Sequence, residues 1–163
     1  MELRPYSEEQ REAFISLNTC PINRKNMNGP HTIESASNLF DKILEPSNTL
    51  LSRAIYQDEV YLGHIFAIEE DNQWELGFIL DKAFWGRGFV EQACRMFVSD
   101  HLSDRKLFAT VDEGHLASMR ILEKLGFDRK EQREDEFWRF LSLHSVRLRL
   151  KVHDTHSLHD ELA

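Results

Sequence analysis

The sequence predicts a mixed α/β layer fold, and two observations lead to this prediction. Two early segments have the apolar spacing, about 3.6 residues, of helices that bury one face. Three strand patterns separated by short turn sequences follow between residues 50 and 80, and helix and strand patterns then alternate. The 163 residues suit one domain that buries about two thirds of the surface its unfolded chain would expose.

The first elements follow from caps and apolar spacing. A short strand is predicted from Leu3 to Tyr6, and Ser7 caps a helix that runs to about Leu17 with acidic residues in its first turn. Thr32 caps a second helix, which Pro46 ends. The predicted apolar face of this helix consists of Ile33, Ala36, Leu39, Phe40 and Ile43.

The next three elements form an antiparallel meander. The strands Leu50 to Tyr56 and Val60 to Ile68 flank the turn Gln57-Asp58-Glu59 and therefore predict a hairpin. The turn Asp71-Asn72 leads into the third strand, Trp74 to Leu80.

Helices and strands alternate after the meander. A glycine-bearing turn from Trp85 to Val90 opens a helix, and a strand follows from Lys106 to Val111. A short helix from Ala117 to Leu125 is closed by Gly126, a residue that readily adopts the left-handed conformation of a helix stop. The alternation of apolar and basic residues from Val146 to Val152 predicts a late strand with one buried face.

Composition and charge narrow the class of partner. The chain has 28 acidic residues against 20 Lys and Arg, a formal charge of −8. The acidic excess argues against nucleic acid or an anionic membrane as the main partner and admits a cationic one such as an amine. Hydrophobic residues at 41% exclude wholesale disorder.

We expect a soluble cytoplasmic domain without a metal. The two cysteines, Cys20 and Cys94, are too few for a disulfide framework or a structural zinc site. The start of the chain has no signal-peptide core, and no apolar run approaches the roughly 20 residues that cross a bilayer. His153, His156 and His159 recur at every third position, but they lie in a polar tail that offers a metal no fixed backbone.

The sequence Gly86-Arg87-Gly88 lies between a strand and a helix, an arrangement that can bind an anion. The first turn of a helix has unpaired N–H groups and a partial positive charge, and glycines let a phosphate come close. Arg87 adds a full positive charge. The spacing fits neither the P-loop pattern nor the dinucleotide fingerprint, because Glu91 occupies the place of its last glycine. Taken alone, a simple tight turn is the alternative.

Three stretches together resemble the GNAT acetyltransferase family, and most closely its ribosomal-protein N-terminal acetyltransferase (RimJ/RimL-type) branch. They are Trp74 to Leu80 leading into Trp85 to Glu91, His115 to Phe127 with its ending Glu-Lys-Leu-Gly-Phe, and the opening Leu3-Arg4-Pro5. The resemblance extends from Leu3 to about Val152. It implies a single domain over residues 1–153, followed by a polar tail over residues 154–163.

The resemblance implies a mixed, mostly antiparallel sheet that splays between its fourth and fifth strands, with helices on both faces. Acetyl-CoA would be the cosubstrate, and its pantetheine would lie between the strands Trp74 to Leu80 and Lys106 to Val111. Backbone groups of Phe78, Ile79 and Leu80 would pair with the pantetheine, and an N–H there would polarise the thioester carbonyl. The pyrophosphate would be held by Trp85, Gly86, Arg87, Gly88, Phe89 and Val90.

The chain departs from the family pattern at four positions. Trp85 replaces the usual Gln or Arg, and Val90 is bulkier than the usual Gly or Ala. His115 replaces an Asn, although a neutral imidazole can still form a hydrogen bond with CoA. Leu122 stands where relatives carry a Tyr that acts as general acid, so that route is closed.

Acetyl transfer to an amine needs a neutral amine, donors for the oxyanion and a proton for the thiolate. Glu75 is the first candidate base; the alternative is a solvent-facing strand residue. Glu134 and Glu136 are rival bases in a highly charged stretch. Ser118 matches a family Ser that can protonate the CoA thiolate, and its alternative is a hydrogen bond to its own backbone.

The predicted function is acetyl-CoA-dependent N-acetyltransfer directly to a primary amine. The acceptor is a protein N-terminus or a small amine such as a polyamine, an amino acid or an aminoglycoside. The alternative is an acyl-CoA-binding module of the same fold that has lost turnover. A monomer and a homodimer both remain open, because edge strands can pair across a dimer or be protected by charge.

Overall fold

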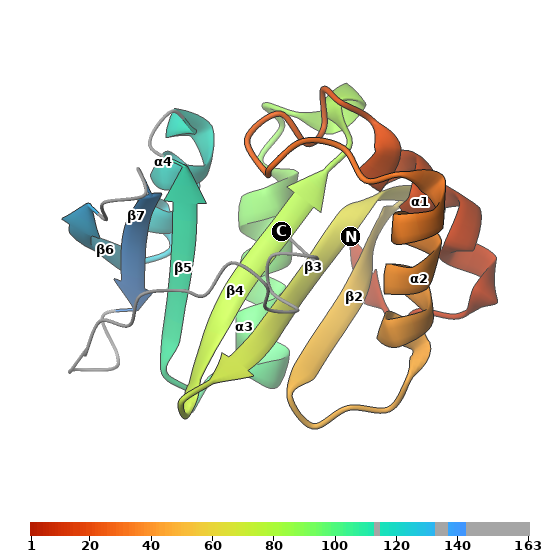
Figure 1. The fold of residues 1–163 in the computed structure, drawn as a ribbon. Coiled ribbons are helices and arrows are strands. Elements are labelled where there is room, and N and C mark those ends of the chain that lie inside the picture. Colours follow the sequence, from red (N-terminus) through yellow and green to blue (C-terminus); the bar gives the residue numbers. More distant parts are fainter. Residues whose placement is uncertain (113–114, 133–136, 143–163) are drawn as a thin grey trace.

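The computed structural model describes residues 1–112, 115–132 and 137–142, and Figure 1 shows the order of the elements. These are β1 (Glu2–Arg4), η1 (Glu8–Gln10), α1 (Arg11–Thr19), α2 (Ile33–Leu44), β2 (Leu50–Gln57), β3 (Val60–Glu70), β4 (Gln73–Leu80), η2 (Lys82–Phe84), α3 (Phe89–His101), β5 (Leu107–Asp112), α4 (Leu116–Lys124), β6 (Phe127–Gln132) and β7 (Phe137–Ser142).

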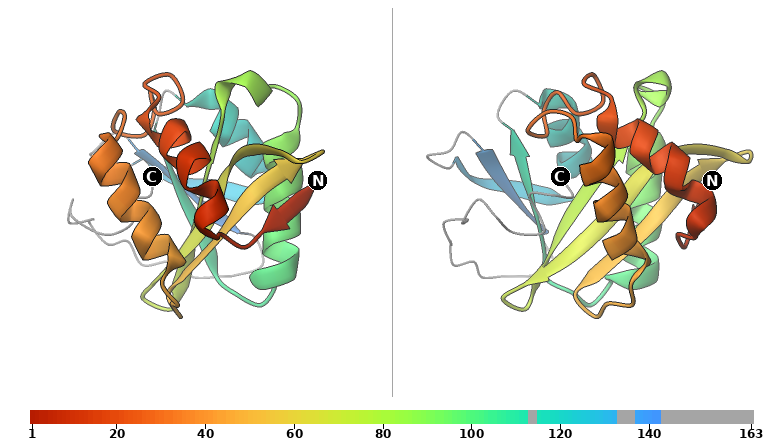
Figure 2. Two further views of the ribbon diagram at one scale, coloured as in Figure 1. Left: turned by 90° about the vertical axis from the view of Figure 1, so that its right-hand side faces the viewer. Right: turned by 45° about the vertical axis from the view of Figure 1, so that its right-hand side comes forward.

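The strands form one sheet in the order β1-β2-β3-β4-β5-β7-β6. All neighbouring strands are antiparallel except β4 and β5, which are parallel. The left view of Figure 2 shows α1 and α2 on one face of the sheet and α3 on the other. The structure therefore confirms the mixed α/β class with a mostly antiparallel sheet and helices on both faces.

The turns of the meander lie where the sequence predicts them. Asp58 and Glu59 have φ values of 48° and 64°, and Asp71 and Asn72 have values of 51° and 63°. Two successive residues with positive φ match the right-handed twist of the two strands that they join, and Asp and Asn tolerate this conformation better than most residues. The local sequence thus favours three of these four positive φ values, and Glu59 is the exception.

Two apolar clusters hold the layers together. The cluster between the sheet and α3 includes Leu76, Leu80, Ala93 and Phe97, and it buries Cys94, whose thiol pKa is raised by that burial. The cluster between the sheet and helices α1 and α2 consists of Phe14, Leu39, Phe40, Ile43, Leu50 and Phe66. Residues of β3 belong to both clusters, whereas those of β4 belong to the cluster beside α3.

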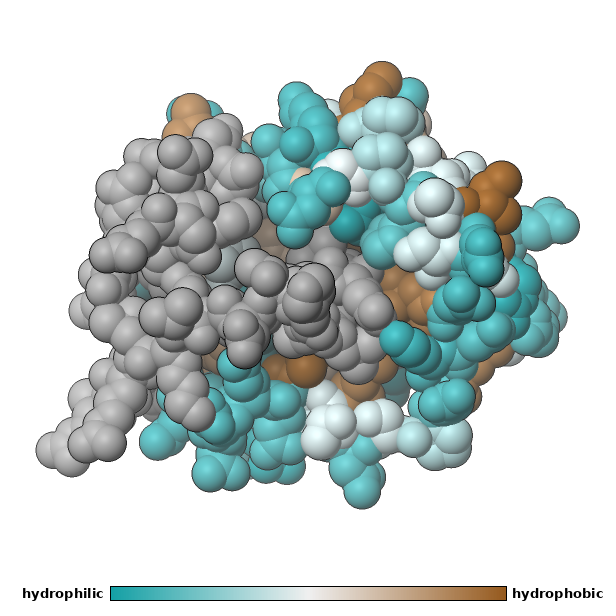
Figure 3. All heavy atoms as spheres, in the orientation of Figure 1, coloured by the Kyte–Doolittle hydropathy of each residue, from teal (hydrophilic) through white to brown (hydrophobic). Residues whose placement is uncertain are grey.

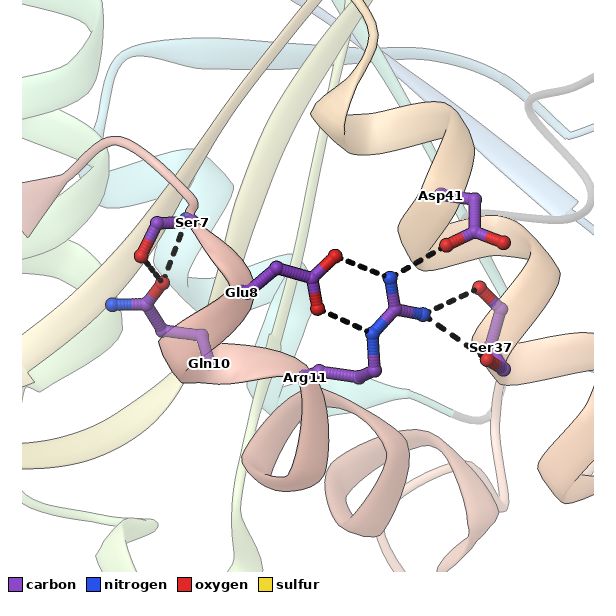
Figure 4. Close-up of polar contacts among 6 residues, drawn as sticks. All are labelled: Ser7, Glu8, Gln10, Arg11, Ser37 and Asp41. Atoms are coloured by element: carbon purple, nitrogen blue, oxygen red, sulfur yellow. Dashed lines mark hydrogen bonds and ion pairs between the residues drawn. The ribbon is translucent and has the colours of Figure 1, made fainter.

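The start of the first helical segment is fixed by polar contacts (Figure 4). Ser7 and Gln10 form a reciprocal capping box, which satisfies two backbone donors of the first turn. Arg11 makes ion pairs at 2.7 Å with Glu8 and at 2.6 Å with Asp41 of α2. The guanidinium thereby joins the two helices that cover one face of the sheet.

The helix α2 confirms its predicted cap and corrects its predicted face. Thr32 accepts a hydrogen bond from the Ser35 amide, and Ala36, Leu39, Phe40 and Ile43 are buried. Ile33 is 70% exposed, so its predicted place on the buried face is wrong. The first residue of the helix projects beyond the edge of the cluster that the later turns reach. The strand predicted from Val146 to Val152 lies outside the described residues.

Two glycines in the meander permit close packing, and they support a stability prediction. A Cβ on Gly63 would collide with the backbone carbonyl of Ile79, and one on Gly77 would collide with the ring of Phe66. We expect Gly63→Ala to lower the free energy of unfolding by about 2–3 kcal/mol and Gly77→Ala by about 1–2 kcal/mol, because a ring can rotate whereas a paired strand must move as a whole. Urea unfolding of both variants measures this order, and equal or reversed losses would contradict it.

The described surface on the face shown in Figure 3 is mainly hydrophilic, with hydrophobic residues at separate places. Within residues 1–112, 115–132 and 137–142, no helix is both long and apolar enough to cross a membrane.

Candidate functional site

The parallel strands β4 and β5 are paired only near their N-terminal ends. Two pairs join them, Trp74 with Leu107 and Glu75 with Phe108. The Trp74 amide donates to the Lys106 carbonyl at 2.7 Å. The register stops after Glu75, whereas β4 stays paired with β3 as far as Leu80. The sheet therefore splays between its fourth and fifth strands, as the family resemblance implies.

Beyond Glu75 the splay leaves a gap between β4 and β5. The C-terminal half of β4 presents backbone groups to this gap. Because the backbone groups of alternate residues point to the same side of a strand, Phe78 and Leu80 share the direction of Trp74, toward β5. The backbone of Ile79 turns instead toward β3, where His64 is its partner in the register. Of the three residues predicted to pair with pantetheine, two thus face the gap through their backbones.

Trp85 closes the segment between β4 and the glycine turn. Its indole Nε1 donates to the Leu80 carbonyl at 2.8 Å, while the ring remains 43% exposed. This bond occupies one of the backbone groups that face the gap and leaves those of Phe78. Trp85, the departure from the family's Gln or Arg, therefore has a clear structural role.

The glycine turn has the geometry of an anion site. Gly86 and Gly88 have φ values of 75° and 78°, and a Cβ on either would meet nothing within 4 Å. Gly88 is the N-cap of α3 and supplies no capping side chain. The Gln92 amide is the first to donate within the helix, to the Gly88 carbonyl at 3.2 Å. The preceding N–H groups thus lie at an open, glycine-lined helix start.

The side chains around this turn leave it accessible. Phe89 and Val90 pack against the apolar cluster beside α3, so the extra bulk of Val90 is directed into the core. Arg87 is exposed and forms no ion pair with any described residue. A positive side chain and unpaired amides therefore occur together at the start of α3.

Glu75 lies where the pairing of β4 and β5 ends and the gap begins, and its side chain is buried. It occupies the last paired position of β4 and β5, and only 1% of its surface is exposed. It shares its face of the sheet with Gly77, which lies against Phe66 of the cluster under α1 and α2. The alternative of a solvent-facing glutamate is therefore wrong, because the side chain is buried.

Thr110 is a polar residue of the gap that the sequence did not indicate. It lies on β5 two residues after Phe108, so its side chain is on the same face of the sheet as that of Glu75. Its Oγ1 is buried and has no hydrogen-bond partner among the described residues. The only signal in the sequence was its alternation with the apolar residues of the strand.

His115 and Ser118 form a pair at the start of α4. His115 is the N-cap of the helix, and its Nε2 lies 3.1 Å from the Oγ of Ser118, which is 6% exposed. This contact to another side chain differs from the bond to its own backbone that was the alternative for Ser118. Leu122, one turn further on, is fully buried in the core.

A buried histidine lies beneath the covering helices. His64 on β3 is fully buried, and its Nδ1 lies 2.9 Å from the Tyr6 hydroxyl, which in turn lies 2.9 Å from that of Tyr61. The Nε2 atom has no hydrogen-bond partner among the described residues. Burial, and secondarily the positive charge of Arg24, lower the pKa of His64 to about 3. The imidazole is therefore neutral at physiological pH.

Glu134 and Glu136, the rival bases, lie outside the described residues. Within the part of the chain that the structure describes, no group of three or more His, Cys, Asp or Glu side chains is placed to hold a metal ion.

A sequence relative and three solved structures resemble this chain. The Bacillus subtilis (strain 168) uncharacterised protein YkkB is 32% identical over 62 residues, so the chain spans about a third of that relative, 36% of each sequence. The spermidine N-acetyltransferase of Vibrio cholerae in complex with CoA and spermine has a TM-score of 0.74 at 15% identity, with 86% of this chain and 93% of that chain covered.

Two further structures agree with this fold. An acetyltransferase of Thermus thermophilus has a TM-score of 0.72 at 16% identity, covering 86% of this chain and 94% of that chain. A GNAT-family acetyltransferase of Bacillus anthracis has a TM-score of 0.68 at 17% identity, covering 85% and 90%. The family model "Acetyltransferase (GNAT) domain" matches residues 1–128, and the chain therefore belongs to the GNAT acetyltransferase family.

Proposed function

We propose that the protein is an acetyl-CoA-dependent N-acetyltransferase that transfers the acetyl group directly to a primary amine. One observation carries the proposal: the gap between β4 and β5 opens beside a glycine-lined helix start. An extended chain with a pyrophosphate at one end fits this combination of free strand edge and anion site. The resemblance to the RimJ/RimL-type branch favours a protein N-terminus as acceptor, whereas the spermidine enzyme of Vibrio cholerae has a small polyamine.

The residues present fit acetyl-CoA. The backbone of Phe78 offers strand-type hydrogen bonds toward the gap, and the amides at the start of α3 with Arg87 offer a site for the pyrophosphate. Open space at the Cβ positions of Gly86 and Gly88 leaves room for phosphate oxygens. When bound, acetyl-CoA supplies an activated acetyl group as a thioester.

Glu75 and Thr110 lie where they can act on the amine. Glu75, which lies where the gap begins, would take a proton from the attacking amine, directly or through a water. The unpartnered Oγ1 of Thr110 would orient the amine from the opposite strand. Backbone N–H groups of β4 near Phe78 would stabilise the negative charge that develops on the thioester oxygen.

Ser118 and His115 would serve the leaving group. The Oγ of Ser118 would give a proton to the thiolate, and His115 at 3.1 Å would orient that hydroxyl and replace its proton. In this role His115 takes over a position at which relatives carry an Asn. We also propose a single domain over residues 1–153 with a tail over 154–163, and a cytoplasmic location.

The departures at Val90, His115 and Leu122 are the reason to consider an inactive binding module as the alternative. The packing of Val90 against the core and the contact of His115 with Ser118 support the active enzyme over this alternative.

A thermal melt with and without acetyl-CoA tests the proposal. At a hundredfold excess over Kd, binding stabilises the fold by about 2.7 kcal/mol, which raises Tm by roughly 5–10 °C for a domain of this size. Release of the CoA thiol with a panel of primary amines then measures turnover. An unchanged Tm would reject the acetyl-CoA site, and a shift without thiol release from any amine would favour the binding module.

A further inference from the structure

The acceptor side of the site borders the segment of residues 20–31, which joins α1 to α2. Asn23 fixes this segment to the end of β4: its Nδ2 donates to Asp81 at 3.2 Å, and its Oδ1 accepts from the Lys82 amide at 2.9 Å. Figure 1 shows the segment at the C-terminal end of β4, beside the turn that leads to α3. An amine that enters the gap from the side of α1 and α2 therefore passes this segment.

The segment is positively charged in an otherwise acidic chain. Residues 20–31 contain Arg24 and Lys25 but no Asp or Glu, although the whole chain has a formal charge of −8. One carboxylate that the segment contacts is that of Asp81, which accepts bonds from Asn23 and from the Ala83 amide. Both oxygens of this neighbouring acid therefore serve to fix the backbone.

Arg24 places a buried positive charge under the segment. Its side chain is 2% exposed and donates to the carbonyls of Gly29 and Met27, each at 2.7 Å, and to Asn18 Oδ1 at 3.2 Å. All three acceptors are neutral, and no described carboxylate pairs with the guanidinium. A buried charge without an opposite charge is unfavourable, so the site favours an anion close by.

The positive charge of Arg24 acts on the neighbouring strand β3. The positive charge of Arg24 contributes to the low pKa of His64, whose partner on β4 is Ile79. Burial lowers the pKa of Arg24 itself to about 10, so the guanidinium stays protonated at neutral pH. The exposed Lys25 adds a second cation 5.7 Å from the ring of Trp85, at the rim of the gap.

We propose that the acceptor is an amine that also carries an anionic group, such as a carboxylate, and that Lys25 with the buried charge of Arg24 selects it. This proposal rests on the N-acetyltransferase function proposed above. A polyamine is disfavoured, because its second ammonium group would approach two cations, and residues 20–31 contain no acid to receive it. The same two cations make it easier for the reacting ammonium to lose its proton, which direct transfer requires.

Matched acceptors test the selection. β-Alanine and propylamine differ by a carboxylate, as do the peptide amides Ala-Asp-Ala and Ala-Asn-Ala, and 1,4-diaminobutane adds a second cation. We expect about tenfold higher kcat/KM for the anionic member of at least one pair, the effect of one charge pair several Å apart near a protein surface. Preference in the amino-acid pair would identify small acceptors, and preference in the peptide pair alone would identify a protein N-terminus.

Two exposed charge reversals assign the effect to the segment. Lys25→Glu should remove the tenfold preference and leave the KM for acetyl-CoA within about twofold. The matched control, Lys106→Glu, makes the same charge change at an exposed residue directly before β5, where the Lys106 carbonyl pairs with Trp74, and should keep the preference. A preference unchanged in Lys25→Glu, or a change confined to the KM for acetyl-CoA, would overturn the proposal.

Binding separates this proposal from the proposed function. The rise in Tm that each amine causes at saturating CoA reports acceptor binding without turnover. Selective stabilisation by the anionic members without thiol release would support the acceptor class and reject the transferase. Turnover or binding without preference for the anionic members, including no binding by any of the five amines, would reject the acceptor class.

Discussion

A Glu75→Gln variant is expected to lose about 100-fold or more in kcat/KM for the acceptor amine while it still binds acetyl-CoA. A positioned general base contributes about 10²–10⁴-fold to such a reaction, and a glutamine amide cannot take the proton. Glu75 lies at the last paired position of β4 and β5, where the gap begins. The substitution retains the shape of the side chain, so kcat/KM can fall while the acetyl-CoA-induced rise in Tm stays as in the wild type.

The pH dependence distinguishes a base from a residue that merely supports the fold. An α-amine has a pKa of about 7.7–8.0, so above roughly pH 9 most of it is neutral without help from the protein. For such an acceptor the deficit of Glu75→Gln should therefore shrink as pH rises. Glu69→Gln, the same change on β3 beside Trp74, is the matched control and should retain wild-type rates. Wild-type kcat/KM in Glu75→Gln at every pH would eliminate Glu75 as the base.

The local elements could be predicted because each depends on residues close in sequence. Thr32 caps α2, and the turns at residues 58–59 and 71–72 contain the Asp and Asn residues that positive φ favours. The same reasoning failed at Ile33, because which turn of a helix reaches the core depends on where the helix lies over the sheet. Apolar spacing defines a face but not its extent.

The candidate site could be predicted only as far as its motifs. Gly86 and Gly88 carry their own signal, and both adopt the positive φ that glycine permits. The burial of Glu75 and Thr110 depends on contacts between strands and helices far apart in the sequence, which alternation along one strand cannot report. Arg24 lies in a polar loop, and nothing in its local sequence indicates that the segment folds over its guanidinium.

In the sequence, His64 interrupts the apolar run from Leu62 to Ile68. The structure gives it a stability role, since the run is the buried strand β3 and the imidazole stacks on Phe66 at 5.2 Å between ring centroids. Protonation would place a charge inside this cluster. The fold therefore depends on a neutral histidine, which makes its stability sensitive to acid.

The protein is expected to lose about 2–3 kcal/mol of unfolding free energy between pH 7.5 and pH 4.5 through His64 alone. The pKa of His64 is about 3 in the folded state against 6.5 for an unperturbed histidine, with burial as the main cause and the charge of Arg24 as the second. Between these two values the unfolded chain binds the proton and the folded chain does not. Stability therefore falls as the pH falls through this window, by about 1.4 kcal/mol per pH unit.

A His64→Asn variant isolates this effect. Asparagine can still form a hydrogen bond with the Tyr6 hydroxyl but cannot take a proton, so the variant should be less stable than the wild type at pH 7.5 because ring packing is lost. Both proteins share every carboxylate, so the difference between their urea-unfolding free energies removes the acid titration that they have in common. That difference should shrink by about 2–3 kcal/mol on going to pH 4.5. A difference that stays constant with pH would mean that His64 takes up its proton as readily in the folded protein as in the unfolded chain, and that the neutral, buried imidazole is not what makes this fold sensitive to acid.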